Sequence, residues 1–297
     1  MTHREVLSFD GPLLIACNHP NSFLDAIIIA TLFKKPVYSL VRGDTFKKKS
    51  FASLLSSLNM LPVYRISEGV ENLDQNYETF EKCKEIFKRN GIVLIFSEGR
   101  CINEWKLRPL KKGTARLAIS SWEEGIPLKV LPTGINYQSF SSFGKNIHLN
   151  FGSIIDQSCV TNNNGYGNTI NKFNEKLRVE LKSLVIESDA ADKENLQNIF
   201  AIKQPLLKKI LLLIPAFAGF ILNAPLYIPL QKLSWRTSKH LDHYDSVLVG
   251  LLFILYPIYL LIIFLLVTAL TNWFLGLAVF ILLPFTAWSF IQLKKQF

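Results

Sequence analysis

The sequence contains few cysteines, and their spacing excludes two common uses of this residue. Four cysteines are spread over 297 residues, and no two of them form a Cys-x-x-Cys pair. Zinc sites and small disulfide frameworks need closely or regularly spaced cysteines, so we expect reduced thiols and no metal. A Gly-rich nucleotide loop, internal repeats and a nucleic-acid-binding module are also missing from the sequence. We therefore expect no nucleic-acid partner.

A secretory signal is also missing. The only apolar run before the first polar motif, Leu13 to Cys17, is too short for the hydrophobic region of a signal peptide. We therefore expect the N-terminal part of the chain to stay on the cytoplasmic side.

Charge is nearly absent from the last third of the chain. Residues 206–297 carry seven basic and two acidic side chains, whereas residues 1–205 carry 26 and 21. No residue is charged between Asp245 and Lys294, and these 48 residues suffice for two membrane spans of about 20 residues each. We predict a domain of ordinary soluble composition over residues 1–205 and a membrane region over residues 206–297.

Within the membrane region we expect transmembrane helices over residues 247–270 and 273–293, joined by a turn at Thr271-Asn272. Basic residues flank this pair on both sides, and the turn has none. The flanking residues are Lys232, Arg236, Lys239, Lys294 and Lys295. Because lysine and arginine favour the cytoplasmic side, both ends of the pair should lie there, with the turn outside.

A third apolar run, Ile210 to Leu230, differs because three prolines interrupt it and basic residues stand at both of its ends. A single crossing would put one basic cluster on the disfavoured side. We therefore favour a broken helix over residues 206–231 that is re-entrant or interfacial, with a third full span as the alternative. The following His240 to Asp245 could offer metal ligands, but a polar interfacial loop is the better interpretation.

Residues 1–205 alternate between strand-like and helix-like segments. We expect strands over residues 13–17, 37–41, 62–64, 92–96, 128–131 and 147–151, and helices over 24–33, 50–58, 71–89, 113–122 and 169–186. Alternation at this spacing predicts an α/β fold, a mostly parallel sheet with flanking helices. Ligands bind such sheets at the carboxyl ends of the strands, where the polar motifs of this sequence fall.

The first polar motif places His19 just after the first strand and Asp25 in the first turn of the following helix. A carboxylate that accepts a hydrogen bond from one ring nitrogen fixes the tautomer, so that the other nitrogen can take a proton. The pair would then act as a general base on a substrate hydroxyl. The alternative is a loop histidine beside an aspartate that caps the helix.

Three further strand ends carry residues suited to a phosphorylated polyol. Arg65 follows the strand over 62–64, and its guanidinium matches a phosphate. Glu98 and Gly99 follow the strand over 92–96, where a carboxylate can bind hydroxyls and glycine permits close approach. Pro132 closes the strand over 128–131. Each signal is weak alone, because a surface arginine or an ordinary turn would look the same.

Together, in this order and spacing, the four motifs resemble the phospholipid/glycerol acyltransferase family, which acylates glycerol-3-phosphate and lysophosphatidate. The resemblance runs from about Gly11 to Gly134, with weaker support to about Ile186. It implies the glycerolipid acyltransferase fold, with His19 as catalytic base and Asp25 as its partner. It also implies that Arg65 binds the acceptor phosphate. Glu98 and Gly99 would bind the acceptor, and Pro132 would shape the pocket.

The sequence departs from the common family pattern in two places. Five residues separate His19 from Asp25 instead of four, a spacing found in a subset that includes fungal-type glycerol-3-phosphate acyltransferases. The extra residue must be absorbed in the loop if Asp25 is to reach the ring. Ser97 replaces the common proline, and Arg100-Cys101 replaces the common Thr-Arg, so Arg100 is not equated with the family's arginine.

The resemblance implies a membrane-bound O-acyltransferase of phospholipid synthesis. It would move a fatty acyl group from acyl-CoA or acyl carrier protein to a hydroxyl of glycerol-3-phosphate or lysophosphatidate. The expected partners are membrane lipids and the acyl donor, which is a co-substrate, and no cofactor is implied. Two alternatives stay open: an acyltransferase or transacylase for another lyso-lipid or amino-lipid, and a non-catalytic lipid-binding membrane protein.

Overall fold

The computed structural model describes residues 4–47, 49–64, 75–160, 165–189, 192–202, 204–238 and 242–294. The chain forms two compact units. The sheet unit comprises Met1–Pro20, Leu24–Asn136 and His148–Asp189. The helical unit comprises Asn21–Phe23, Tyr137–Ile147 and Ala190–Phe297. The helical unit thus contains all of the expected membrane region, and it also takes in residues 190–205 and two short earlier pieces.

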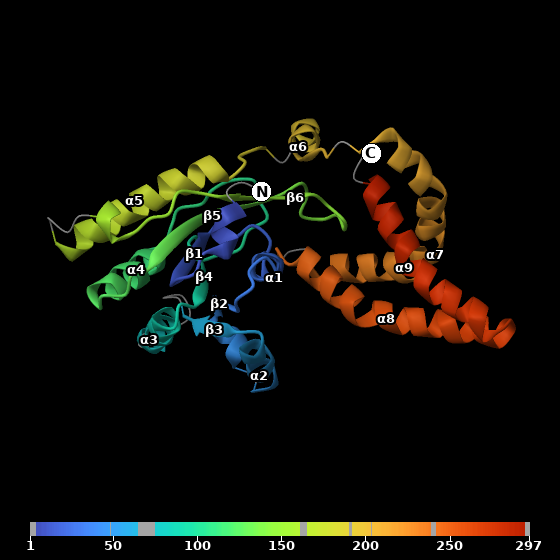
Figure 1. The fold of residues 1–297 in the computed structure, drawn as a ribbon, viewed down its shortest axis with the longest axis horizontal. Helices are drawn as coiled ribbons and strands as arrows, with labels where there is room; N and C mark the ends of the chain where they lie inside the picture. Colours follow the sequence, from blue (N-terminus) through green and yellow to red (C-terminus); the bar gives the residue numbers. More distant parts are fainter. Residues whose placement is uncertain are drawn as a thin grey trace. The chain divides into compact units, whose positions relative to one another are not determined.

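Six strands form one sheet in the order β3-β2-β4-β1-β5-β6 (Figure 1). They are β1 (Leu13–Cys17), β2 (Val37–Arg42), β3 (Met60–Val63), β4 (Ile92–Phe96), β5 (Lys129–Tyr137) and β6 (Ile147–Phe151). β1 pairs in parallel with β4 and β5, and β2 pairs in parallel with β3 and β4. The predicted α/β class with a mostly parallel sheet is confirmed.

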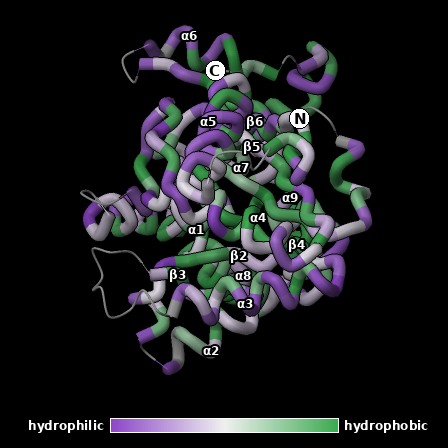
Figure 2. Tube along the Cα trace, turned by 90° about the vertical axis from the view of Figure 1, so that its left-hand side faces the viewer, coloured by the Kyte–Doolittle hydropathy of each residue, from purple (hydrophilic) through white to green (hydrophobic). Residues whose placement is uncertain are grey.

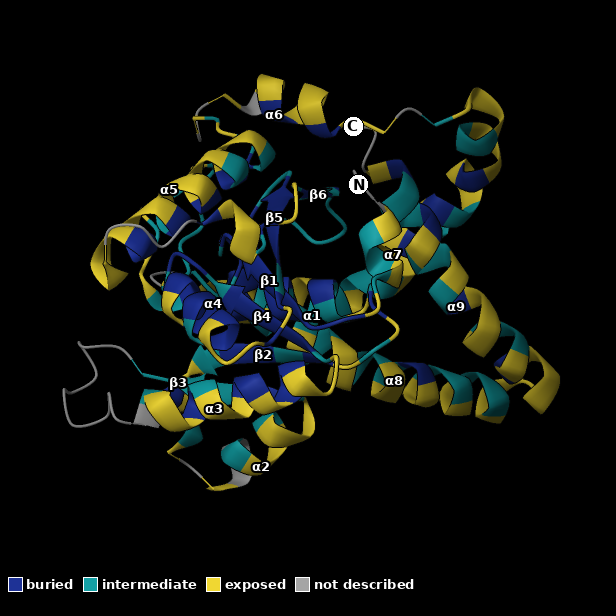
Figure 3. Ribbon diagram, turned by 60° about the vertical axis from the view of Figure 1, so that its left-hand side comes forward, coloured by how far each residue is buried: buried dark blue, intermediate teal, exposed yellow. Residues whose placement is uncertain are grey.

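Helices flank this sheet, and most of them bury apolar side chains in the core beside it. They are α1 (Phe23–Ala30), α2 (Lys49–Ser57), α3 (Gln75–Lys88), α4 (Gly113–Glu123) and α5 (Tyr166–Leu184), with short 3-10 turns η1 (Arg4–Ser8), η2 (Gly43–Phe46) and η5 (Gln157–Cys159). The main core joins β1 and β4 to α3, α4 and α5, and the Trp122 and Phe173 rings meet edge to face at 5.9 Å. Figure 3 shows β1 and most of β4 in the colour of buried residues, and Figure 2 colours the same chain by hydropathy.

One strand end was predicted wrongly, and one helix was not predicted. The strand expected to close at Pro132 continues as β5 to Tyr137. Proline removes one donor from a strand, but the Pro132 carbonyl still accepts a 2.9 Å hydrogen bond from the N–H of Gly152, so the extended chain goes on. Helix α6 (Lys193–Phe200) was not expected, although Asp192 caps it by accepting a 3.1 Å hydrogen bond from the N–H of Asn195.

The helical unit is dominated by three long helices, α7 (Leu206–Ser238), α8 (Tyr244–Leu270) and α9 (Trp273–Lys294). Each is long and apolar enough to cross a membrane. Figure 1 shows that α7 bends along its length. Pro215, Pro225 and Pro229 lie inside it, and each removes a backbone donor that a straight helix would use. That this segment is re-entrant stays a prediction.

The three helices pack closely at two glycines. A Cβ atom added to Gly219 of α7 would lie 2.1 Å from the carbonyl oxygen of Thr286 in α9. One added to Gly276 of α9 would lie 2.1 Å from the Thr268 hydroxyl of α8. Small residues that let backbones touch are typical of helix packing in membranes.

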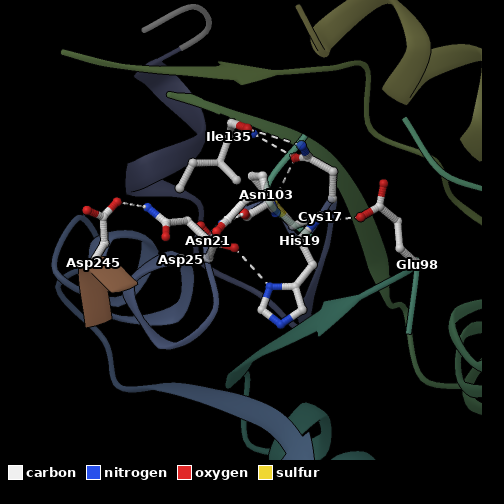
Figure 4. A network of polar contacts seen from close by, with 10 residues as sticks. Cys17, His19, Asn21, Asp25, Glu98, Asn103, Ile135 and Asp245 are labelled. Atoms are coloured by element: carbon white, nitrogen blue, oxygen red, sulfur yellow. Dashed lines mark hydrogen bonds and ion pairs between the residues drawn. The ribbon is translucent and has the colours of Figure 1, made fainter. Parts of the chain in front are cut away.

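A buried polar cluster ties together segments of the helical unit that are far apart in sequence. Asp245, in the first turn of α8, forms an ion pair with Lys145 and accepts a 2.7 Å hydrogen bond from Nδ2 of Asn21 (Figure 4). Asn21 is fully buried and Asp245 is 3% exposed. The expected polar loop before α8 thus ends in a carboxylate that is ion-paired inside the protein.

Candidate active site

The candidate site forms where two neighbouring parallel strands end. β1 and β4 pair in register up to Cys17 and Phe96. The residues that follow, His19 after β1 and Glu98 after β4, therefore leave the sheet at the same edge. The backbone N–H of His19 donates a 2.8 Å hydrogen bond to Oε2 of Glu98, which joins the two loops directly.

Two contacts hold the His19 ring in one orientation. Nδ1 lies 2.9 Å from Oδ2 of Asp25, whose side chain is 0% exposed, whereas the His19 side chain is 17% exposed. The ring stacks on Phe96, with centroids 3.8 Å apart and planes 11° apart. Because an ionised carboxylate can only accept, Nδ1 carries the hydrogen and Nε2 is able to take a proton. Figure 4 shows the ring turned so that Nε2 points away from Asp25.

The extra residue between His19 and Asp25 is accommodated by a left-handed turn. Ser22 has a φ of 55°, which few residues other than glycine adopt, and α1 begins at the next residue. Asp25 then falls in the first helical turn and reaches the ring at ordinary hydrogen-bond distance. The five-residue spacing therefore leaves the expected pair intact.

Glu98 is buried, and both of its carboxylate oxygens accept backbone hydrogen bonds. Oε2 accepts from the N–H of His19 and Oε1 from the N–H of Arg108, each at 2.8 Å. Burial raises the pKa of the Glu98 carboxyl above its usual value, while these two hydrogen bonds favour the charged form and act against the rise. Glu98 thus fixes two loops around His19. Its expected contact with an acceptor stays a prediction.

Gly99 occupies a position where a side chain would be strained. Its φ is +66°, and an added Cβ would lie 3.0 Å from Cγ of Lys111. The N–H of Lys111 donates a 2.7 Å hydrogen bond to the carbonyl of Ser97, which closes the loop around this glycine. The turn itself therefore requires glycine, and a close approach of ligand to Gly99 stays a prediction.

Two asparagines that support the His19 loop were not singled out from the sequence. The Asn18 side chain donates to the carbonyl of Ile135 at 3.1 Å and accepts from its N–H at 2.8 Å, which locks the end of β1 to β5. Nδ2 of Asn103 donates a 2.7 Å hydrogen bond to the carbonyl of Pro20. Asn18 could have been found as a polar residue ending a buried strand, whereas nothing local marks Asn103.

The structure describes only one of the remaining two expected site residues. Arg65 lies outside the described residues. Pro132 is buried inside β5 beside Ala16 of β1, so it is part of the sheet itself and not of a loop at the strand ends.

Comparison with known proteins identifies the part of the chain that carries these residues. Residues 1–136, which include His19, Asp25 and Glu98, match the acyltransferase family. The structure of the 1-acyl-sn-glycerophosphate (LPA) acyltransferase PlsC from Thermotoga maritima is similar to this chain, with a TM-score of 0.44 and 15% sequence identity, over 68% of this chain and 72% of that one. No curated protein sequence matches the chain. The match to the acyltransferase family therefore covers residues 1–136, the part of the chain that carries the His19 and Asp25 pair.

Proposed function

We propose that this protein is a membrane-bound O-acyltransferase of phospholipid synthesis. It moves a fatty acyl group from acyl-CoA or acyl carrier protein to a hydroxyl of glycerol-3-phosphate or lysophosphatidate. The observation that carries this proposal is the 2.9 Å contact between Nδ1 of His19 and the buried Asp25 carboxylate, within the family-matched region. Such a pair serves proton transfer, which a lipid-binding module does not need.

In the proposed reaction Nε2 of His19 takes the proton from the acceptor hydroxyl as its oxygen attacks the thioester carbonyl of the donor. The bond between carbon and sulfur then breaks, and the imidazolium gives its proton to the leaving sulfur, so that a thiol departs and His19 is neutral again. Asp25 stabilises the imidazolium, and stacking on Phe96 keeps the ring aimed at the acceptor. The catalytic contribution of such a base is about 10² to 10⁴ in rate.

The other site residues are proposed to act on the acceptor. Arg65 binds its phosphate through paired, charge-assisted hydrogen bonds. Glu98 and Gly99 lie in the loop that touches the His19 backbone, which favours contact with the glycerol part. Pro132 acts at a distance, by holding β5 beside β1 and so supporting the pocket wall.

The proposal is tested with purified full-length protein in detergent, offered acyl-CoA or acyl carrier protein donors and a panel of acceptors. The panel contains glycerol-3-phosphate, lysophosphatidate, another lyso-phospholipid and an amino-lipid, and both thiol release and acylated product are measured. His19→Ala is the matched control, and its melting temperature is compared with that of the unaltered protein to establish folding.

We expect product with glycerol-3-phosphate or lysophosphatidate and none with His19→Ala. Product only with the other acceptors, or only when a phospholipid replaces the thioester donor, would reassign the substrate class. No product from any combination, with folded protein, would leave a lipid-binding role in place of an enzyme.

We further propose that α8 and α9 are transmembrane and that α7 is re-entrant. The first half of α7 packs on the end of α9, where Leu212 and Ala216 cluster with Leu293. Its second half packs on the start of α8, where Leu230 clusters with Leu248. The start of α8 and the end of α9 share one membrane face if the two form a hairpin, so both ends of α7 return to that face as well.

Basic residues at these helix ends favour the cytoplasmic side for that face and for the catalytic domain. In a variant without its native cysteines, Asn272→Cys should react with an impermeant thiol reagent in intact cells. Lys176→Cys, on the exposed face of α5, should react only after permeabilisation. The reverse pattern would invert the proposed orientation and separate the site from cytoplasmic thioester donors.

A further inference from the structure

The helical unit contains a pocket that the proposed reaction does not use. It has a volume of about 370 Å³ and lies where the end of α7 meets the start of α8. Its lining consists of Ser141, Gln231, Lys232, Trp235, Arg236 and Tyr244. These are two cations, two aromatic rings and two neutral hydrogen-bonding side chains, with no carboxylate. We propose that this pocket binds the phosphate of an anionic membrane phospholipid.

The two cations are placed to act together on one anion. Lys232 and Arg236 are four residues apart in α7, so both side chains lie on the same face of the helix. In the described part of the chain neither forms an ion pair with a carboxylate. The carboxylate of Asp245, next to the pocket residue Tyr244, is already paired with Lys145. The charges of Lys232 and Arg236 are therefore open to a ligand.

The lining as a whole, charged and neutral, suits a phosphate ester better than a bare cation or an apolar molecule. A guanidinium can hold two phosphate oxygens in its planar fork, and an ammonium adds a point charge. The Gln231 amide and the Ser141 hydroxyl supply further donors. Tyr244 is the first residue of α8, so the positive end of this long helix also faces the region.

The surroundings of the pocket select a lipid over a soluble phosphate. Trp235 is 52% exposed and meets Tyr244 edge to face at 5.7 Å, an aromatic pair of the kind found where membrane meets water. Along the same helices, large apolar side chains such as Ile228, 41% exposed, have no cover. A ligand with its phosphate in the pocket and its acyl chains along α7 and α8 would match both the aromatic pair and the exposed apolar side chains. A zwitterionic headgroup would bring a cation toward two others, so an anionic headgroup is favoured.

This inference rests on the membrane assignment of the three helices but not on the acyl-transfer reaction. It is tested by counting the lipids that remain on the purified full-length protein in native mass spectrometry. The protein in detergent is mixed with phosphatidylglycerol or with phosphatidylcholine. The double variant Lys232→Gln/Arg236→Gln removes the pocket charges, and Lys208→Gln/Lys209→Gln removes the same charge from the other end of α7.

We expect the unaltered protein to retain phosphatidylglycerol and to release phosphatidylcholine. Lys232→Gln/Arg236→Gln should retain at least about tenfold less phosphatidylglycerol, because each cation near an anionic lipid strengthens binding roughly fivefold. Lys208→Gln/Lys209→Gln should behave as the unaltered protein. Equal losses in both double variants would mean diffuse attraction, and no loss in the first would mean no site. Either result would overturn the proposal.

Two further measurements complete the test, one with inorganic phosphate and one with a substitute variant. If inorganic phosphate at millimolar concentration displaces the bound lipid, the pocket is a site for soluble phosphate and the lipid assignment is wrong. If the double variant does not fold, Arg236→Lys replaces it, since this variant keeps the charge and loses only the fork. We then expect a severalfold loss of retained phosphatidylglycerol, and an unchanged amount would overturn the proposed role of the arginine.

Discussion

The two units of this chain treat the same kind of side chain in opposite ways. In the sheet unit Phe173 is 0% exposed, packed among strands and helices, whereas in the helical unit Phe253 is 82% exposed. Burying apolar surface from water stabilises the first unit. In the second, large apolar side chains on α7, α8 and α9 face outward. Lipid is the environment that suits such side chains, and small residues let the helices pack closely.

The polar residues of the two units also differ in where they lie and what they contact. At the strand ends of the sheet unit they form hydrogen-bonded networks around His19, whose side chain is 17% exposed. In the helical unit the charged residues stay near the helix ends, and one carboxylate, Asp245, is neutralised inside the protein. The comparison assigns the candidate site to the sheet unit, and the helices that are long and apolar enough to cross a membrane to the helical unit.

The largest expected effect comes from breaking the polar network of the sheet unit. Asp25→Asn should lower the rate of acyl transfer by about 10² to 10⁴, because the amide no longer fixes the tautomer of His19 or stabilises the imidazolium. The measurement is the turnover rate with saturating donor and acceptor. Asp10→Asn, at a carboxylate that is 82% exposed, is the control and should keep normal turnover. Near-normal rates in Asp25→Asn would show that the 2.9 Å contact between His19 and Asp25 is not needed for acyl transfer.

A matched pair of phenylalanines tests the comparison of burial directly. Phe173→Ala should lower the free energy of unfolding by about 3–5 kcal/mol, since it leaves a cavity in a packed core. Phe253→Ala should change it by less than about 0.5 kcal/mol. Both are measured by denaturation of the full-length protein in one detergent. A large loss for Phe253→Ala would mean that this face of α8 packs against protein.

A pair of glycines then sharpens the description of helix packing. Gly219→Val should destabilise the protein by about 1–3 kcal/mol, because its Cβ would meet the Thr286 carbonyl, an atom that cannot move aside. Gly250→Val in α8, where nothing lies within 4 Å of an added Cβ, should be nearly neutral. Apparent melting temperatures in detergent distinguish the two. Similar losses in both variants would point to a general cost of β-branched residues in these helices.

Sequence and structure agree best where the pattern is local. The strand ends at Cys17 and Phe96 were predicted to the residue because apolar runs stop there at polar residues. The His19 and Asp25 pair could also be predicted, since both residues belong to one short motif. The end of β5 was not predicted, because proline usually closes a strand. Here the Pro132 carbonyl accepts a hydrogen bond from the N–H of Gly152, and the strand continues beyond the proline.

What could not be predicted involves partners that are far apart in the chain. Nothing near Asp245 in the sequence indicates that Lys145 and Asn21 neutralise it. In the same way, nothing near Glu98 in the sequence indicates that its oxygens accept backbone hydrogen bonds from His19 and Arg108. Tertiary contacts of this kind depend on how the loops close, which composition and periodicity do not determine.

The smallest expected effect concerns how the stability of each unit depends on pH. No residue is charged between Asp245 and Lys294, so these spans contribute little to pH-dependent stability. In the sheet unit, a 2.8 Å contact with Lys129 and hydrogen bonds from Ser158 lower the pKa of Asp156 well below its usual range. A carboxyl whose pKa is lowered by folding stabilises the folded state above its unfolded pKa, and this contribution is lost as the pH falls toward the folded pKa.

Asp156→Asn should therefore lower the melting temperature of the full-length protein at pH 7 and matter less at pH 3. The loss at pH 7 should be at most about 1 kcal/mol, because both Lys129 and Asp156 are about one-third exposed and solvent screens the pair. Glu123→Gln, at an exposed carboxylate of α4 with no ion pair in the described part of the chain, is the control and should leave the melting curve unchanged. A loss for Asp156→Asn that stays constant between pH 7 and pH 3 would show that the residue acts by its hydrogen bonds to η5 alone, and the charge of the sheet unit would then play no part in the comparison.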